Sequence, residues 1–238
     1  MKKSLLLGLL VCALQAVAQE APSTGEKSVK PGINTRYLDP TLKVDDWLKR
    51  FEVESREVFH NREHILNACE IQPGMVVADI GAGTGLFTRL FSQAVGEKGW
   101  VHAVDINARF LEHIQARAAQ EKQKNITTVL CPQDSVSLPP ESIDLAFICD
   151  VYHHFEFPRT TLESLHRALK PGGRIIMIDF IRIEGVSSDW TLGHVRAGEE
   201  VFRQEVEEAG FRLDAKLKVP GLKDNYCLRF VKAEEKGN

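Results

Sequence analysis

Residues 76–85, with the sequence VVADIGAGTG, constrain the fold more than any other part of this chain. A short apolar run ends in three alternately spaced glycines, and a segment with helical apolar periodicity follows. We therefore predict a buried strand, a tight turn that needs residues without side chains, and the start of a helix. Such a turn lets a ligand lie against bare backbone at a helix N-terminus.

Short apolar strands and amphipathic helices alternate downstream of this turn. The predicted strands are residues 75–80, 100–105, 126–130, 143–149 and 174–180. The first predicted helix covers residues 86–95, and the second extends from its cap at Asn107 to about residue 122. The third covers residues 159–169 and ends at the sequence Lys-Pro-Gly-Gly. This alternation is typical of a parallel sheet with helices on both faces.

The C-terminal part has a different pattern. A helix is expected at residues 199–209, followed by strands at residues 211–219 and 226–231. The loop between these two strands is too short for a parallel return, so they must form an antiparallel hairpin. The predicted fold is thus α/β and doubly wound, with a mostly parallel seven-stranded sheet and an antiparallel C-terminal hairpin.

The first 18 residues have the pattern of a signal peptide. A basic start and a short apolar run precede small residues, and cleavage is expected after Ala18. The apolar run is shorter than the about 20 residues of a membrane-spanning helix. We expect export to the periplasm or cell envelope, without stable membrane insertion after cleavage. An uncleaved N-terminal anchor is the alternative.

The remaining chain reads as one domain with short extensions. Residues 19–41 are a predicted linker, residues 42–233 the domain, and residues 234–238 a polar tail. Within the domain, residues 42–72 form a predicted helical cap, as one kinked helix or two short ones. A chain of 238 residues, 43% hydrophobic, is long enough for one such core.

Composition excludes two classes of site. The net charge of −3 gives no electrostatic case for a nucleic-acid partner. The mature chain has four cysteines, Cys69, Cys131, Cys149 and Cys227, and these form no CxxC pair. Zinc ligands usually occur in closely spaced pairs, so we expect no metal site. The cysteines are read as free core residues, and disulfide formation is left open.

The glycine spacing narrows the choice of cofactor. The dinucleotide fingerprint GxGxxG would require a third glycine at Leu86, which makes a nicotinamide-dependent oxidoreductase a weaker alternative. A Walker phosphate loop is excluded because no Gly-Lys-Ser/Thr follows. Asp105 ends the second strand, where a carboxylate can accept both ribose hydroxyls, and Ile106 beside it could pack on a base. Asp134, after the third strand, could accept the exocyclic amine of an adenine. The alternatives are a solvated loop acid for Asp105 and a turn-initiating residue for Asp134.

Together these motifs, with Ile143-Asp144-Leu145-Ala146-Phe147 and the turn at residues 169–173, resemble those of the class I S-adenosylmethionine-dependent methyltransferases. The similarity covers about residues 44–231 and is greatest to the small-molecule subgroup, as in ubiquinone/menaquinone-type and arsenite methyltransferases. It implies an enzyme that binds S-adenosylmethionine and methylates a small molecule. The oligomeric state and the acceptor are left open.

The resemblance also implies a role for each matching residue. Asp79 and the glycines Gly81, Gly83 and Gly85 should hold the methionine end of the cofactor, and Asp105 its ribose. Asp134 should bind the adenine amine, with Ser135 beside the base. Asp150 matches a position near the methionine portion or the acceptor. Export raises an alternative, a nucleoside- or metabolite-binding module without turnover, because the cofactor is made in the cytoplasm.

The strongest catalytic candidates follow the fourth strand. They are Asp150 and the neighbouring pair His153 and His154, one of which could act as a general base. The alternative interpretation of both histidines is pocket wall. Further acceptor contacts are expected from residues 183–190 and 194–196, and from the N-terminal residues Arg36, Tyr37, Trp47, Glu54 and Arg56.

Overall fold

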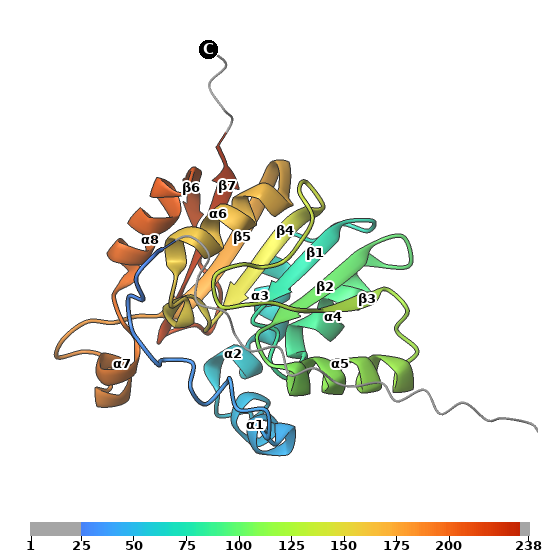
Figure 1. The fold of residues 1–238 in the computed structure, drawn as a ribbon, viewed down its shortest axis with the longest axis horizontal. Helices are drawn as coiled ribbons and strands as arrows, with labels where there is room; N and C mark the ends of the chain where they lie inside the picture. The colour runs from blue at the N-terminus through green and yellow to red at the C-terminus, as the bar shows by residue number, and fades with distance from the viewer. Residues whose placement is uncertain (1–24, 234–238) are drawn as a thin grey trace, which may run out of the picture.

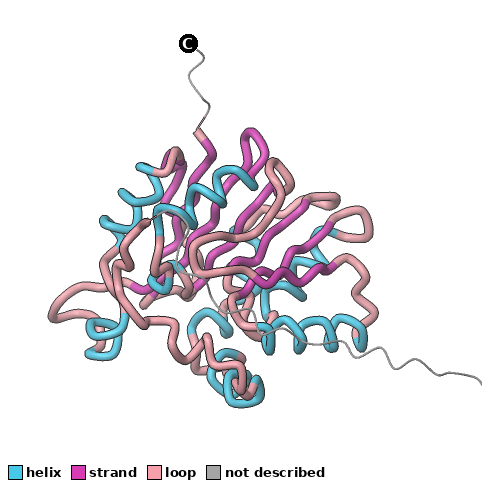
Figure 2. The backbone as a smooth tube through the Cα atoms, in the orientation of Figure 1, coloured by secondary structure: helices cyan, strands magenta, loops and turns pink. Residues whose placement is uncertain are grey.

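The protein is a seven-stranded, mostly parallel sheet covered by helices, as seen in a computed structural model that describes residues 25–233 (Figures 1 and 2). The strand order is β3-β2-β1-β4-β5-β7-β6. Strands β1 to β5 are parallel, and β7 is antiparallel to both β5 and β6. The predicted fold class and its antiparallel hairpin are confirmed. The strands are β1 (Val76–Ile80), β2 (Trp100–Asp105), β3 (Ile126–Leu130), β4 (Ile143–Cys149), β5 (Leu169–Phe180), β6 (Phe211–Lys216) and β7 (Asn225–Lys232).

The side chains of the central strands point alternately to the two faces of the sheet and form a hydrophobic core on each face. On β4, Leu145 and Phe147 join one core cluster, whereas Ala146 and Ile148 join the other. Successive strand residues point to opposite faces, so a strand that is apolar throughout must be covered on both. This explains why the central strands read as continuous apolar runs.

Helices cover the two faces in separate groups. Helices α3 and α4 contribute to the cluster of Leu145, and α6 and α8 to the cluster of Ala146; Figure 1 shows α6 and α8 on the near side of the sheet. The helices are α1 (Val44–Phe51), α2 (Glu57–His60), α3 (Arg62–Ala68), α4 (Leu86–Val95), α5 (Ala108–Gln120), α6 (Pro158–Ala168), α7 (Asp189–His194) and α8 (Glu199–Glu208), with a 3₁₀ turn η1 (Tyr152–His154). The Asn107 side chain caps α5 by accepting a hydrogen bond from the Arg109 amide, as predicted.

Several bounds differ from the sequence-based expectation, since β6 ends at Lys216 and not at residue 219, and helix α7 was not predicted. Two further differences lie in the helical cap and at β5. The helical cap consists of three short helices, not one or two. Where α1 ends, the Arg56 guanidinium donates a hydrogen bond to the Phe51 carbonyl. Strand β5 begins at Leu169, before the Pro-Gly-Gly turn that was expected to precede it. Leu169 pairs with Ile143 and the register then shifts to Leu145 and Arg174, so the turn bulges from the strand without ending it.

The segment before α1 crosses the carboxyl edge of the sheet. The Val29 amide donates to the Glu156 carbonyl at 3.0 Å, and Asn107 Nδ2 donates to the Tyr37 carbonyl at 2.6 Å. Among residues 25–233, no helix has the length and apolarity needed to cross a membrane. The predicted signal peptide, the start of the linker and the polar tail lie outside the described residues, and the predicted domain division stays a prediction.

Candidate active site

A cavity of about 1050 Å³ lies at the carboxyl edge of the sheet, partly closed by the N-terminal segment. In doubly wound sheets ligands bind at this edge, beside the strands where the order reverses, which are β1 and β4 here. Pockets for one drug-sized ligand measure about 300–1,000 Å³. The cavity therefore has room for a cofactor and a small second molecule.

The three glycines of the turn after β1 have different roles. All have positive φ, at +69° for Gly81, +53° for Gly83 and +79° for Gly85. A Cβ on Gly81 would collide with Val151, and one on Gly85 with Ile114. A Cβ on Gly83 would meet the Phe51 ring at 3.6 Å and the Gly81 carbonyl oxygen at 3.9 Å, both ordinary contacts. Gly81 and Gly83 line the cavity, whereas Gly85 packs on α5 outside the lining residues.

Two buried carboxylates lie beside this turn and line the cavity. Asp79 Oδ2 accepts a hydrogen bond from the Thr88 hydroxyl at 2.6 Å, and burial, partly opposed by that bond, raises the pKa of Asp79 to about 7. Asp105 accepts from the amides of Gly83 at 2.8 Å and Asn107 at 2.9 Å. Burial raises the pKa of Asp105 to about 6. Each oxygen of Asp105 has a further lone pair, so the carboxylate can still accept two hydroxyl donors.

Of the remaining residues predicted to contact the cofactor, some line the cavity and one does not. Ile106 and Ser135 line the cavity, as does Gln133. Asp134 is half-buried and stands outside the lining residues, so its contact with an adenine amine stays a prediction.

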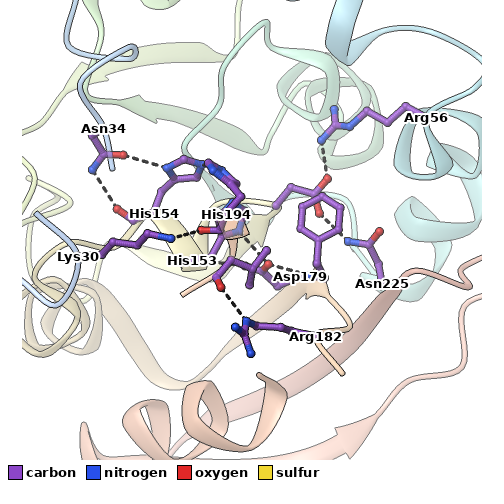
Figure 3. A network of polar contacts seen from close by, with 12 residues as sticks. Lys30, Asn34, Arg56, His153, His154, Asp179, Arg182, His194 and Asn225 are labelled. Carbon is purple, nitrogen blue, oxygen red and sulfur yellow. Dashed lines mark hydrogen bonds and ion pairs between the residues drawn. The ribbon is translucent and has the colours of Figure 1, made fainter. Parts of the chain in front are cut away.

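Asp150 lines the cavity but is bonded to protein at both oxygens. Its Oδ2 accepts from Arg56 Nη2 at 2.6 Å and its Oδ1 from Asn225 Nδ2 at 2.6 Å; the contacts of Arg56 and Asn225 are drawn in Figure 3. Burial raises the pKa of Asp150 and the Arg56 guanidinium opposes this. The carboxylate thus joins the helical cap, the end of β4 and the start of β7. This arrangement favours a positioning role for Asp150 over a direct role in proton transfer.

We expect Asp150→Ala to lower the free energy of unfolding by about 2–4 kcal/mol, because it leaves the Arg56 guanidinium without its carboxylate. The Arg56 side chain is 25% exposed, so water can compensate in part and the lower end of this range applies. Urea denaturation measures the loss. Glu54→Ala is the matched control, since Glu54 is 67% exposed in its ion pairs with His60 and Arg62 and should change stability little. Equal effects in the two variants would contradict the assignment.

Three histidines gather at the other end of the cavity (Figure 3). His153 Nδ1 lies 2.8 Å from Asp179 Oδ1, and both groups are buried. His154 Nδ1 lies 3.1 Å from Asn34 Oδ1, and its Nε2 lies 3.3 Å from Nε2 of His194. Burial, then His153 and His194, lowers the pKa of His154 to about 2. Burial, then His153 and Lys30, lowers the pKa of His194 to about 4. A histidine with so low a pKa is a weak base near neutral pH, so the general-base role of His154 gains no support and stays a prediction.

Many of the other residues expected to contact the acceptor line the cavity, and some do not. Arg36, Tyr37, Trp47, Arg56, Asp189, Trp190 and His194 line the cavity. Glu54 bonds to His60 at the surface, and Arg196 is paired with Glu205. The sequence analysis missed Asn34, Asp179 and Asn225. Asp179 had a usable signal, since it lies near the end of an apolar strand as Asp79 and Asp105 do.

Comparison with known proteins finds similarity over part of the chain. Residues 78–177 match the family model described as "Methyltransferase domain". The ubiquinone/menaquinone biosynthesis C-methyltransferase UbiE of Hydrogenovibrio crunogenus is 28% identical over 123 residues, which cover 51% of this chain and 48% of that protein. The chain thus matches about half the length of this curated relative.

Solved structures share the fold. A SAM-dependent methyltransferase from Aquifex aeolicus superposes with a TM-score of 0.70 at 23% identity, covering 81% of this chain and all of that one. An arsenic(III) S-adenosylmethionine methyltransferase from Chlamydomonas reinhardtii gives a TM-score of 0.53 at 22% identity, with 69% and 65% coverage. Both similarities extend well beyond the residues that the family model matches.

The glycine end of the cavity fits the cofactor of this fold. Asp105 offers lone pairs to a ribose diol, Gly83 presents backbone without a side chain, and Ile106 gives an apolar surface beside them. The four cysteines of the described residues are free thiols; Cys69 and Cys227 are buried, and Cys131 and Cys149 are half-buried.

Proposed function

Because the chain carries a methyltransferase domain in the class I S-adenosylmethionine-dependent fold, we propose that it transfers the methyl group of S-adenosylmethionine to a small-molecule acceptor. The observation that carries this proposal is one continuous cavity with two chemically distinct ends. Its glycine end has the groups that suit the cofactor, and its other end has histidines and aromatic rings that suit an acceptor.

The residues of the chain hold and align the two molecules. Asp105 accepts the ribose hydroxyls, the Gly83 backbone lets the cofactor approach, and Asp79 faces its cationic methionine end. When bound, the cofactor supplies an electrophilic methyl group on a sulfonium. Such a group needs an aligned nucleophile more than it needs acid or base, and alignment alone accounts for a large part of the barrier reduction.

The acceptor end favours a flat or polar small molecule. Trp190 stacks on His194 with ring centroids 4.7 Å apart, and Tyr37 meets His154 edge-on at 4.9 Å. Arg36 and Lys30 add positive charge among the lining residues. These groups suit a polar aromatic or anionic acceptor. The name of the UbiE relative, a C-methyltransferase, supports methylation at carbon as one form of this reaction.

Calorimetry with S-adenosylhomocysteine tests the cofactor half of the proposal. We expect micromolar binding, and at least 30-fold weaker binding in Asp105→Ala, because hydrogen bonds to a charged group contribute about 1.5–3 kcal/mol each. Asp46→Ala, which removes a carboxylate that is 63% exposed, should leave the affinity unchanged. Binding of NAD in place of S-adenosylhomocysteine would refute the proposal.

Transfer of radiolabelled methyl groups into fractionated envelope and cytoplasmic extracts would then find the acceptor. Export of the chain stays a prediction that rests on the first 18 residues.

A further inference from the structure

At the acceptor end of the cavity the geometry points to a metal site: we propose that His153, His154 and His194 bind one divalent transition-metal ion, with Zn²⁺ preferred. This site was not predicted from the sequence, because His194 lies 40 residues beyond His154 and reaches it only through the fold. One potential ligand nitrogen from each of the three side chains lies within 4.8 Å of the others.

The spacing approaches that of a tetrahedral site. Zinc–nitrogen bonds of about 2.0–2.1 Å at tetrahedral angles place two ligand nitrogens about 3.3 Å apart. The Nε2 atoms of His154 and His194 are 3.3 Å apart. The 4.8 Å within which all three nitrogens lie exceeds this spacing by about 1.5 Å at most.

The hydrogen bonds around His154 direct a lone pair into the cluster. Asn34 Nδ2 donates to the His154 carbonyl at 3.0 Å, and a carbonyl can only accept, so the amide orientation of Asn34 is fixed. Asn34 Oδ1 must therefore accept from the Nδ1–H of His154. The lone pair of that ring lies on Nε2, which is the atom that faces His194.

His153 has the corresponding support from a carboxylate. Its Nδ1 is bonded to Asp179, which is fully buried, so Nε2 is the nitrogen left for a ligand. Histidine ligands of metals commonly donate their other N–H to a carboxylate or carbonyl oxygen, which fixes the ring and strengthens it as a ligand. Asn34 and Asp179 give this support to two of the three rings.

The surrounding charges indicate what the open position would take. Lys30 Nζ donates to the carbonyls of Gly193 and His194, and Arg182 to those of Leu192 and Val195 (Figure 3). Three neutral imidazoles leave the metal with its full charge, and these cations add to it. The fourth position, which faces the cavity, should therefore hold an anionic oxygen or sulfur.

This arrangement would activate a methyl acceptor, a part of the inference that rests on the proposed function. An acceptor hydroxyl or thiol bound to the metal loses its proton to solvent at neutral pH, because the metal lowers its pKa. The ionised oxygen or sulfur then forms a bond to the methyl carbon, and the carbon–sulfur bond of the sulfonium breaks with its electron pair returning to sulfur. No protein base is needed, because the proton passes to solvent.

The test is metal titration of the full chain, purified without a polyhistidine tag and stripped with a chelator. We expect one equivalent of Zn²⁺ by calorimetry, and one equivalent of Co²⁺ with the visible absorption of a four-coordinate ion. His194→Ala should weaken binding at least 100-fold. Asn34→Ala and Asp179→Asn, which change only the supporting contacts, should weaken it 10- to 100-fold. His60→Ala removes an exposed histidine outside the cluster and should have no effect.

Circular dichroism checks that each variant is folded, and His194 is the safest ligand to replace because it is half-buried near the surface. Absence of saturable binding, or equal binding by the wild type and folded His194→Ala, would overturn the metal site. The titration needs neither cofactor nor acceptor. Binding of S-adenosylhomocysteine without metal binding would thus overturn this inference alone, and the reverse result would overturn the proposed function alone.

Discussion

Gly83→Val is expected to abolish measurable binding of S-adenosylhomocysteine while leaving the protein folded. Gly83 lines the cavity, and its nearest neighbour for an added Cβ is the Phe51 ring at 3.6 Å, an ordinary contact. The two methyl groups of valine would instead occupy the space where the backbone should meet the cofactor. A loss of at least 100-fold in affinity, measured by calorimetry, is the expected result.

Backbone strain needs a separate control, because Gly83 has a φ of +53° that a β-branched residue adopts only at a cost of about 1–2 kcal/mol. Gly96 has a φ of +66° with no atom within 4 Å of an added Cβ, and it lies at the opposite end of α4. Gly96 also has a ψ of −172°, a backbone region that essentially only glycine adopts, so Gly96→Val should lose at least as much stability and still keep its affinity for S-adenosylhomocysteine. If Gly83→Val binds as tightly as Gly96→Val, the cofactor does not lie where we place it.

Most of the fold could be predicted because the information was local. Strands β2, β3 and β4 and helix α4 have the predicted bounds. Each strand is a run of apolar residues and the helix has a helical apolar repeat, and glycine, proline or polar residues mark where each element ends. The error at β5 arose where local and tertiary information disagree. Pro-Gly-Gly signals a turn, yet pairing of Leu169 with Ile143 keeps the segment in the sheet as a bulge.

The candidate site could be predicted only in part, for a related reason. Residues that follow predicted strands, such as Asp105 and His154, were found because parallel strands end at one edge. Asn34 was missed because it lies in a segment without periodicity, and docking of that segment onto the strand ends depends on tertiary contacts. The proximity of His194 to His154 likewise depends on where α7 packs.

Asp79→Asn is expected to stabilise the protein at pH 8 by about 2–4 kcal/mol and to leave its stability at pH 4 nearly unchanged. Burial raises the pKa of Asp79 from 3.8 in the unfolded chain to about 7 in the folded one. A group whose pKa is raised by folding contributes stability below its unfolded pKa, and this contribution is lost as pH rises through its folded pKa. Asparagine does not ionise, and its oxygen can still accept from Thr88, so the variant avoids this loss.

The same substitution should weaken cofactor binding, which shows why a buried carboxylate would be retained at such a cost. The methionine end of the cofactor carries an ammonium group, and an ionised Asp79 attracts it where a neutral amide does not. We expect the affinity for S-adenosylhomocysteine at pH 8 to fall about 10-fold, which corresponds to about 1.4 kcal/mol. Wild-type binding near pH 6.5 should release a fraction of a proton, detected by calorimetry in buffers of different ionisation heat, and Asp79→Asn should release less.

Urea denaturation from pH 4 to pH 8 tests the predicted effect of Asp79→Asn on stability. Parallel stability profiles for wild type and variant would show that Asp79 is not the buried acid that opposes folding at high pH, and Asp105, with a pKa raised to about 6, would be the next residue to replace.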